Sequence, residues 1–391
     1  MAPDDSRAPV RPAAPFPPAA PLPPAGPLPP AAPPAAAQAL PGATAPGPAA
    51  PGAPRVWIID EEWGSVDFEA DLVRRAYPGA QVLHSTYSYE GDLETFGRTC
   101  DIILAQIYAQ LPATVIDQLR NCRGIAVMGG GFDRVDVSAA AARSIPVTNV
   151  QGYCAEDIAQ YVLTAVLNDA KPHVGAIGPE GPRPWGLLAY PQLPHRVAGR
   201  TLLVVGYGRI GRTVARRAVG IGLHVIAVDP HVGVAAMAAD GVEKVEWDQG
   251  FARADVVSLH CSLGVGTRGI IGEREFALMP DHALLVNTSR GAVIDEGALV
   301  RALEEGDIRA AVLDVVTQEP PRFDEEIFGT PHASITPHVS YLSYESITEL
   351  RTRCVRNALA MYAGEIPEDC VNRDALPRPA LASAAPNEWK E

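Results

Sequence analysis

Three polar residues have the types and positions that acid–base chemistry on a small carboxylic acid would need. Each comes just after the end of a segment that the sequence predicts to be a strand. Arg290 carries a planar guanidinium that can bind a carboxylate through two parallel hydrogen bonds and polarise an adjacent carbonyl. His338 can give a proton to a carbonyl oxygen or take one from a hydroxyl. Glu319, which precedes two prolines, would favour the imidazolium form of His338 if the two side chains pair.

A glycine-rich turn indicates a second kind of chemistry, the binding of a pyrophosphate. The apolar run 202–205 predicts a strand, and the six residues after it fit the pattern G-x-G-x-x-G. The first glycine allows a sharp turn, and the second lets a pyrophosphate approach the backbone. The third lets the next helix, expected over 212–219, pack closely on the sheet. The residues of this motif expected at the cofactor are Gly206, Gly208, Arg209, Ile210 and Gly211.

An acidic residue indicates which nucleotide this turn would bind. Asp229 ends the next predicted strand, 224–228, about 20 positions after the glycines. A carboxylate there accepts a hydrogen bond from the ribose 2′-hydroxyl of NAD and repels the 2′-phosphate of NADP. No arginine stands at 230–233 to reverse this preference. The alternative is a glycine-rich turn in another kind of α/β protein.

The composition limits the classes of function. The chain has 391 residues, enough for about two domains, and a formal net charge of −14 with no basic run. Nucleic acids and anionic membrane surfaces are therefore not expected as partners, because both require clustered Lys and Arg. The apolar stretches are too short for a transmembrane helix, and the N-terminus lacks the apolar core of a secretory signal. Six cysteines without a C-x-x-C spacing indicate reduced thiols in a cytoplasmic protein and no metal site.

Both ends of the chain have a composition unlike that of a folded domain. Residues 1–54 hold 19 of the 38 prolines, interleaved with alanine, and cannot build a core. We expect a disordered arm with polyproline II character. Its P-x-x-P spacings would suit an SH3-like partner, but a linker-like tail or an over-long gene start is the simpler interpretation, because any Pro/Ala tract contains such spacings. Residues 374–391 are expected to form a flexible tail.

Between these ends, strand-like and helix-like segments alternate, which predicts an α/β protein with parallel sheets. The expected strands are 56–59, 81–84, 100–106, 124–127, 146–149, 202–205, 224–228, 254–260, 283–287, 310–316 and 334–336. The expected helices are 67–76, 113–121, 136–144, 153–168, 212–219, 235–240, 273–278, 296–305 and 344–363. A surface connection rich in Pro and Gly is expected over 171–196.

Several sequence blocks, in this order, resemble the D-isomer-specific 2-hydroxyacid dehydrogenases. They are GGGFDRVD at 129–136, PVTN at 146–149, the glycine turn, VVSLH at 256–260, NTSRGAVIDEGAL at 287–299, VLDVVTQEPP at 312–321 and TPH at 336–338. The resemblance covers residues 98–373, and more loosely 55–97. Within the family, YCAEDIA at 153–159 and IPEDCVN at 366–372 are most similar to the branch of the C-terminal-binding proteins and their bacterial relatives.

The resemblance implies a two-domain enzyme. A Rossmann doubly wound parallel sheet would bind NAD, and a smaller flavodoxin-like α/β domain would bind the substrate. The implied boundaries are 55–152 for the first part of the substrate-binding domain, 153–338 for the NAD-binding domain and 339–373 for the return to the substrate-binding domain. A small 2-oxo or 2-hydroxy acid as substrate and a homodimeric assembly are also implied.

The resemblance assigns roles to single residues. Arg290 is expected to bind the substrate, His338 to act as acid and base, and Glu319 to be the partner of His338. Backbone N–H groups of Gly129, Gly130 and Gly131 are expected to face the substrate carboxylate, with Tyr108 and Tyr341 lining the pocket. Further residues expected at the cofactor are Cys261, Thr288, Ser289 and Asp314, the last at the nicotinamide carboxamide.

Two classes of function stay open at this point. One is an NAD-dependent enzyme that interconverts a 2-oxo acid and a D-2-hydroxy acid, which the complete set Arg290, Glu319 and His338 favours. The other is an NAD(H)-regulated binding protein with a corepressor-like role, whose interaction segment would be the Pro-rich arm. In the C-terminal-binding proteins a Trp stands three residues after the catalytic His. This chain has Tyr341 there, so their substrate preference does not carry over.

Overall fold

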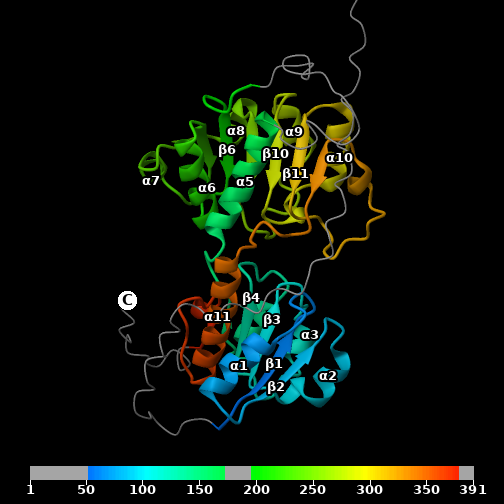
Figure 1. Ribbon diagram of the computed structural model, residues 1–391, viewed down its shortest axis with the longest axis vertical. Coiled ribbons are helices and arrows are strands. Elements are labelled where there is room, and N and C mark those ends of the chain that lie inside the picture. The colour runs from blue at the N-terminus through cyan, green and yellow to red at the C-terminus, as the bar shows by residue number, and fades with distance from the viewer. Residues whose placement is uncertain (1–51, 172–194, 378–391) are drawn as a thin grey trace, which may run out of the picture.

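The chain forms two lobes, each built on its own parallel β-sheet (Figure 1). This computed structural model describes residues 52–171 and 195–377. The arm up to residue 51, the connection at 172–194 and the tail from residue 378 lie outside the described residues. The two sheets confirm the predicted class, a Rossmann sheet together with a second, smaller α/β unit.

The smaller lobe holds a five-stranded sheet in the order β2-β1-β3-β4-β5, which is the order of flavodoxin-like folds. Its strands are β1 (Arg55–Ile59), β2 (Gln81–Ser85), β3 (Ile102–Gln106), β4 (Gly124–Met128) and β5 (Val147–Thr148). Its helical segments are α1 (Asp67–Ala76), α2 (Glu90–Thr95), η1 (Gly97–Thr99), α3 (Ala113–Ile116) and α4 (Val137–Ala142).

The central strands of this sheet are apolar because both of their faces are covered. Successive side chains of β1 point to opposite faces, so Trp57 and Ile59 pack into one core while Val56 and Ile58 pack into another. All four side chains are fully buried. This burial of both faces fixes the register of β1 and so fixes where the loop after Ile59 leaves the sheet.

The larger lobe holds a seven-stranded sheet in the order β12-β11-β10-β9-β6-β7-β8. Its strands are β6 (Thr201–Val205), β7 (His224–Val228), β8 (Glu243–Lys244), β9 (Val256–Leu259), β10 (Leu284–Asn287), β11 (Ala310–Leu313) and β12 (Ala333–Ile335). Its helical segments are α6 (Arg209–Gly220), α7 (Val234–Ala238), α8 (Trp247–Arg253), α9 (Glu273–Leu278), η3 (Gly291–Val293), α10 (Glu296–Glu305) and η4 (Glu326–Gly329). The strand order reverses between β6 and β9, which is where a Rossmann sheet binds its dinucleotide.

The glycine turn lies at this switch point, and its helix begins earlier than expected. We expected the helix from residue 212, but α6 begins at Arg209, because Gly208 is the N-cap and its carbonyl accepts the first helical hydrogen bond from Arg212 N. Gly211 is therefore inside the first turn. A Cβ atom on Gly211 would lie 2.0 Å from the carbonyl oxygen of Gly206, so only glycine permits this close approach of helix and strand.

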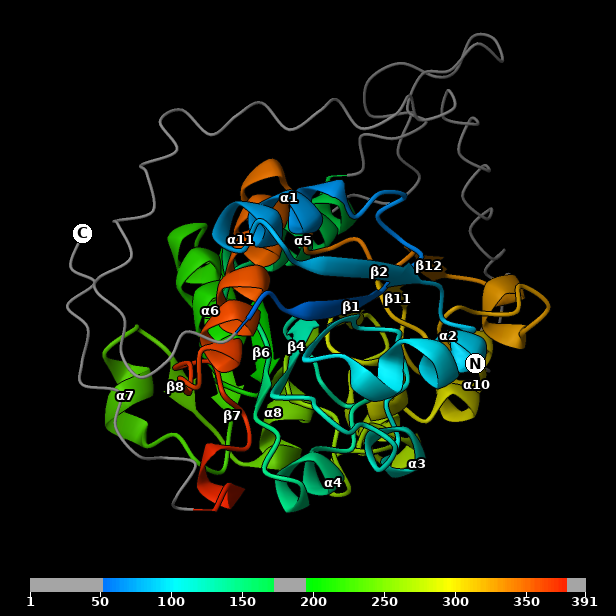
Figure 2. The same cartoon turned by 90° about the horizontal axis from the view of Figure 1, so that it is seen from below.

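Two long helices connect the lobes. α5 (Ala155–Ala170) packs on α6 and contributes to a core of the larger sheet. α11 (Tyr344–Tyr362) returns to the smaller lobe and covers β3 and β4. Figure 2 shows α11 beside α1. The chain thus passes from the smaller lobe to the larger one and back, and the described residues begin and end in the smaller lobe.

The folded body reaches slightly into the segments expected to be tails. Pro54 is buried, and its carbonyl accepts a hydrogen bond of 2.9 Å from Gln81 N at the start of β2. At the other end, η5 (Arg373–Ala375) is ordered and the following Leu376 is buried. Ordered contacts therefore include residues 52–54 and 373–376, while the domain boundaries expected from the sequence stay predictions.

Some expected helices are shorter, and some short ones were not expected. The segment 113–121 is helical only up to Ile116, because Gln118 N and Leu119 N bond to carbonyls three residues back, at Val115 and Ile116. The sequence analysis assigns no element to the segments that form α2, α8 and β8, since each is too short to show a period.

Candidate active site

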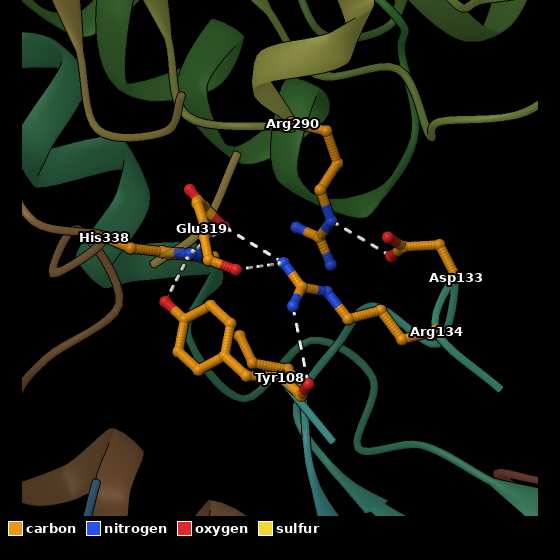
Figure 3. Close-up of a pocket in the computed structure, with 7 residues that line it drawn as sticks. Tyr108, Asp133, Arg134, Arg290, Glu319 and His338 are labelled. Carbon is orange, nitrogen blue, oxygen red and sulfur yellow. Dashed lines mark hydrogen bonds and ion pairs between the residues drawn. The ribbon is translucent and has the colours of Figure 1, made fainter. Parts of the chain in front are cut away.

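The carboxyl ends of the two sheets contribute to one pocket between the lobes. In open α/β sheets this is the edge at which ligands bind. Figure 3 shows its side chains converging from both lobes. The lining residues are Ile107, Tyr108, Asp133 and Arg134 from the smaller lobe, and Arg290, Glu319 and His338 from the larger. The three residues expected to carry the chemistry, Arg290, Glu319 and His338, are brought together here.

The imidazole of His338 is held through its Nδ1 atom. Nδ1 lies 3.1 Å from Oε2 of Glu319 and 3.0 Å from the hydroxyl oxygen of Tyr108. A carboxylate can only accept, so Nδ1 carries a proton that it donates toward Glu319. In the part of the chain that the structure describes, no hydrogen bond uses Nε2 of His338. The ring is therefore fixed with Nε2 free for another molecule.

Asp314 holds the loop that carries His338. Its buried carboxylate accepts hydrogen bonds from Thr336 Oγ1 at 2.6 Å and from the backbone N–H groups of Val339 and Ser340, both at 2.8 Å. Its own carbonyl accepts a bond of 2.9 Å from His338 N. These protein donors satisfy the buried charge. The contact with a nicotinamide carboxamide, expected for Asp314, stays a prediction.

Arg290 lies over the loop expected to receive a carboxylate. Its Nε donates to Oδ1 of Asp133 at 3.0 Å, and its Nη1 donates to the carbonyl of Ser289 at 2.8 Å. A Cβ atom on Gly131 would lie 1.4 Å from Nη2 of Arg290, so the absence of a side chain at Gly131 makes the space for the guanidinium. The guanidinium therefore lies against the glycine loop at 129–131 and is paired there with the carboxylate of Asp133.

Two tyrosines flank the imidazole, of which Tyr108 lines the described pocket and Tyr341 does not. The ring of Tyr108 lies 5.8 Å from that of His338, and the ring of Tyr341 lies 6.1 Å from it, both edge to face. Burial raises the pKa of both tyrosines, so their hydroxyls stay protonated at neutral pH. Tyr341 is also packed against Tyr153, at 6.2 Å.

Four further residues at the site were not singled out from the sequence. Asp133 orients Arg290, as described above. Arg134 donates to the carbonyl of Glu319 at 3.1 Å and lies 4.0 Å from its Oε2. Glu62 comes shortly after β1, and Gln106 is the last residue of β3. Their side chains are hydrogen-bonded to each other. Asp133 and Arg134 stand inside the GGGFDRVD block, whereas the only sequence signal for Glu62 is its place just after a strand.

The glycine turn has the open backbone that a pyrophosphate needs. Gly206 has a φ of +94°, and a Cβ there would lie 2.7 Å from the backbone nitrogen of Cys261, which places the expected residue Cys261 directly against the turn. A Cβ on Gly208 would meet no atom within 4 Å, so the space beside it is open at the N-terminus of α6. Asp229 accepts a bond of 2.8 Å from Tyr207 N, inside the turn.

The remaining residues expected at the cofactor lie at the same edge. Thr288 follows β10, and its Oγ1 is buried with no partner among the described residues, so a ligand can satisfy it. Ser289 is fixed by two bonds to Asn287 Oδ1, at 3.0 and 2.9 Å. The side chain of Arg209 bonds to Gln151, and that of Ile210 packs into the core. Arg209 and Ile210 could therefore bind a phosphate only through their backbone N–H groups. Together these features fit a dinucleotide.

Titratable groups outside the pocket have structural roles. Burial lowers the pKa of His260 to about 3, and this neutral ring lies 2.8 Å from Ser258 Oγ. The six cysteines are unbridged. Within residues 52–171 and 195–377 no group of three or more His, Cys, Asp or Glu side chains could hold a metal ion. In the same ranges, no helix has both the length and the apolar character that crossing a membrane requires.

A Rossmann sheet with a glycine turn at its switch point, together with an arginine, a carboxylate and a histidine that follow strands of the same sheet, is characteristic of nicotinamide-dependent dehydrogenases. Comparison with known proteins narrows this class. The family model described as "D-isomer specific 2-hydroxyacid dehydrogenase, NAD binding domain" matches residues 187–340.

Two curated relatives and one solved structure illustrate the similarity. A glyoxylate reductase of Korarchaeum cryptofilum is 34% identical over 281 residues, which is 71% of this chain and 85% of the relative. A hydroxypyruvate reductase of Blautia hydrogenotrophica is 33% identical over 67% of this chain and 82% of the relative. The crystal structure of a glyoxylate reductase from Paecilomyes thermophila superimposes with a TM-score of 0.69, at 27% identity, over 82% of this chain and 99% of that one.

The chain belongs to the D-isomer-specific 2-hydroxyacid dehydrogenase family, as its sequence blocks indicated. It is an NAD-dependent oxidoreductase that acts on the CH–OH group of 2-hydroxy acids. Its placement in the branch of the C-terminal-binding proteins stays a prediction.

Proposed function

We propose that this protein interconverts a short 2-oxo acid and the corresponding D-2-hydroxy acid, with His338 as acid and base. The observation that carries the proposal is the hydrogen bonding of the imidazole. Nδ1 is held by Glu319 at 3.1 Å and by Tyr108 at 3.0 Å, and His338 lines the pocket with no hydrogen bond at Nε2 among the described residues. A proton on Nε2 can then be passed to a substrate oxygen without movement of the ring.

The other residues of the pocket have complementary roles. Arg290 and the backbone N–H groups of Gly130 and Gly131 would bind the substrate carboxylate, and the guanidinium would polarise the adjacent carbonyl. The N–H of Gly129, also expected to bind it, donates to the carbonyl of Val127 at 3.0 Å. Glu319 stabilises the imidazolium that exists before reduction. The NAD cofactor, when bound at the glycine turn and Asp229, supplies or accepts the hydride. In reduction His338 gives its proton to the carbonyl oxygen, and in oxidation it takes the hydroxyl proton.

The second class of function, an NAD(H)-regulated binding protein, is less well supported. A binding role would not require that Arg290, Glu319 and His338 be complete and oriented toward one pocket. The names of the two relatives, glyoxylate reductase and hydroxypyruvate reductase, also favour turnover of a short 2-oxo acid. A homodimeric state and a cytoplasmic location complete the proposal as expectations from the family.

The test is NADH oxidation by the full-length chain with a panel of 2-oxo acids that includes glyoxylate, pyruvate and hydroxypyruvate. The proposal expects turnover that saturates with at least one of these acids and yields the D-isomer of any chiral product. NADH binding without turnover of any acid would support the binding-protein alternative instead.

A further inference from the structure

One arginine of the smaller lobe contacts both of the groups that hold the imidazole of His338. Nδ1 of His338 is bonded by the carboxylate of Glu319 and by the hydroxyl of Tyr108. Arg134 donates to the backbone carbonyls of both of these residues and lines the same pocket. Figure 3 shows its guanidinium bonded to both. The proposed reaction assigns no role to Arg134.

The contact with Glu319 joins the two lobes. Nη2 of Arg134, from the loop after β4, donates to the carbonyl oxygen of Glu319 at 3.1 Å and lies 4.0 Å from its Oε2. Within the larger lobe, Oε1 of Glu319 accepts from Val316 N at 3.3 Å, a long bond for an N–H donor. The shorter bond from Arg134 therefore helps to fix the backbone from which the carboxylate reaches Nδ1.

The contact with Tyr108 involves both the backbone and the ring of that residue. Nη1 of Arg134 donates to the carbonyl oxygen of Tyr108 at 3.4 Å, and the guanidinium carbon lies over the ring, 5.0 Å from its centre. A guanidinium is attracted to the electron-rich face of an aromatic ring. Arg134 thus holds the ring by its face, while the hydroxyl of the same ring reaches Nδ1 of His338.

The position of Arg134 is itself set by the smaller lobe. Its carbonyl accepts a hydrogen bond of 2.9 Å from Leu111 N, and the next residue, Val135, pairs with Leu111 in an isolated parallel bridge. Leu111 and Val135 are buried in one core of this lobe. The loop that carries Arg134 is therefore tied to the segment that carries Tyr108.

The charge of Arg134 and its contacts would act on His338 in opposite directions. A positive charge near an imidazole disfavours the imidazolium form, whereas a carboxylate held at Nδ1 favours it. As a charge alone Arg134 would oppose reduction, and as a support for Glu319 it would favour reduction. Besides Glu319 and Tyr108, the charged or titratable groups that surround this imidazole among the described residues are Tyr341, Asp314, Asp133, Arg290 and Glu62.

We propose that Arg134 is a positioning residue for the proton transfer, which holds Glu319 and Tyr108 against Nδ1 of His338 through its fork of donors. The proposal rests on the proposed function, because it takes His338 to be the acid of the reduction. A planar guanidinium offers two nitrogens in fixed directions and a flat surface for the ring, and an ammonium offers neither. Arg134→Lys therefore keeps the charge and removes the support.

The experiment measures NADH oxidation with the best 2-oxo acid of the panel, as a function of pH, in the full-length wild type and in Arg134→Lys. The fall of kcat/KM with rising pH should move to lower pH in the variant, because a displaced Glu319 favours the imidazolium form less. At the pH optimum kcat should fall about 10-fold, the scale of one hydrogen bond to a charged group, with KM for the acid nearly unchanged. Titration with NADH counts the folded sites, and the position of the fall does not depend on their number.

Two further variants test the route of the effect. Arg134→Lys combined with Glu319→Gln should have the pH profile of Glu319→Gln alone, because the carboxylate through which Arg134 acts is already absent. Arg143→Lys is the matched control. Arg143 also donates to two carbonyls of the smaller lobe, those of Asp117 and Leu119, and is not among the residues that line the pocket. It should leave kcat and the pH profile unchanged.

Three results would overturn the inference, and they are distinguishable. If Arg134→Lys keeps the wild-type kcat and pH profile, Arg134 is not a support for Glu319, and a change confined to KM would show that it binds the substrate directly. If the double variant moves the profile beyond that of Glu319→Gln, Arg134 acts on His338 by another route. In both cases the proposed function stands. If the wild type turns over none of the acids while it binds NADH, the proposed function fails and this inference fails with it.

Discussion

At the scale of single residues, the site depends on holding one imidazole in an unusual backbone conformation. His338 has a φ of +55°, in the left-handed region that costs a non-glycine residue about 1–3 kcal/mol. Asp314 offsets that cost, since its carboxylate and carbonyl accept bonds from the backbone of three consecutive residues, His338, Val339 and Ser340. We interpret Asp314 first as the residue that positions His338.

Glu319 should set the alkaline limit of the reductive reaction. Reduction needs the imidazolium form of His338, and the carboxylate 3.1 Å from Nδ1 favours that form. In Glu319→Gln the charge is lost and the shape is kept, so the fall of kcat/KM with rising pH should move to lower pH. The measurement is the pH profile of NADH oxidation.

The matched control for this variant is Glu326→Gln, an exposed position in the same segment of the chain. It should leave the profile where it is. An alkaline limb that Glu319→Gln does not move would mean that another group controls the proton.

Glu62 should also make stability depend on pH. Burial raises its pKa from the usual 4.5 to about 7, so the native state holds this proton more tightly than the unfolded chain. Its contribution to stability is therefore fully present below about pH 4.5 and is lost as the pH rises through about 7. The difference in Tm between Glu62→Gln and the wild type should therefore be more positive at about pH 8.5 than at about pH 5. Thermal unfolding followed by circular dichroism at the two pH values tests this, and an equal change at both would contradict it.

At the scale of elements, β6, the glycine turn and α6 could be expected from the sequence because local rules fix them. The pattern that predicts them spans about 20 residues: an apolar run, three glycines at fixed spacing and a helix. The start of α6 was misplaced by three residues, because the sequence does not show that Gly208 is the N-cap. Short elements such as α2 and α8 were missed, since six or seven residues held by tertiary packing show no period of their own.

The end of β7 should determine cofactor choice. The carboxylate of Asp229 accepts hydrogen bonds from the backbone N–H groups of Tyr207, His231 and Val232. These bonds fix it close to the turn. A 2′-phosphate would face this charge, and we expect kcat/KM for NADH to exceed that for NADPH. Asp229→Asn should reduce the ratio about tenfold or more.

The control for cofactor choice is Asp281→Asn, a highly exposed carboxylate between α9 and β10. Its ratio of NADH to NADPH should equal that of the wild type. Equal kcat/KM for NADH and NADPH in the wild type would contradict the role of Asp229 in cofactor choice.

At the scale of the whole molecule, the site exists only where the two lobes meet. Tyr108 and His338 are 230 positions apart and share a hydrogen bond, and Asp133 and Arg290 are 157 apart. The order of Arg290, Glu319 and His338 along the chain could be recognised, but their partners Asp133 and Arg134 could not, because nothing local to those residues records which strand ends face each other.

The Pro/Ala-rich arm should be dispensable for this body. Its composition cannot build a core, and the first residues seen to contact the smaller lobe are 52–54. Deletion of residues 1–51 should leave Tm and turnover with a 2-oxo acid nearly unchanged. A parallel deletion of 1–56, which removes Pro54 and the start of β1, should lower Tm. A large loss of Tm or turnover in the shorter deletion would show that the arm packs on the body.

The most direct test of the central claim is the turnover of His338→Gln measured together with its NADH affinity. If Nε2 of His338 gives the proton, kcat for 2-oxo acid reduction should fall by about 10²–10⁴-fold. NADH should bind as in the wild type, because the glycine turn and Asp229 are unchanged. A His338→Gln protein that binds NADH and retains near-normal kcat would contradict the account, since the proton would then come from another group.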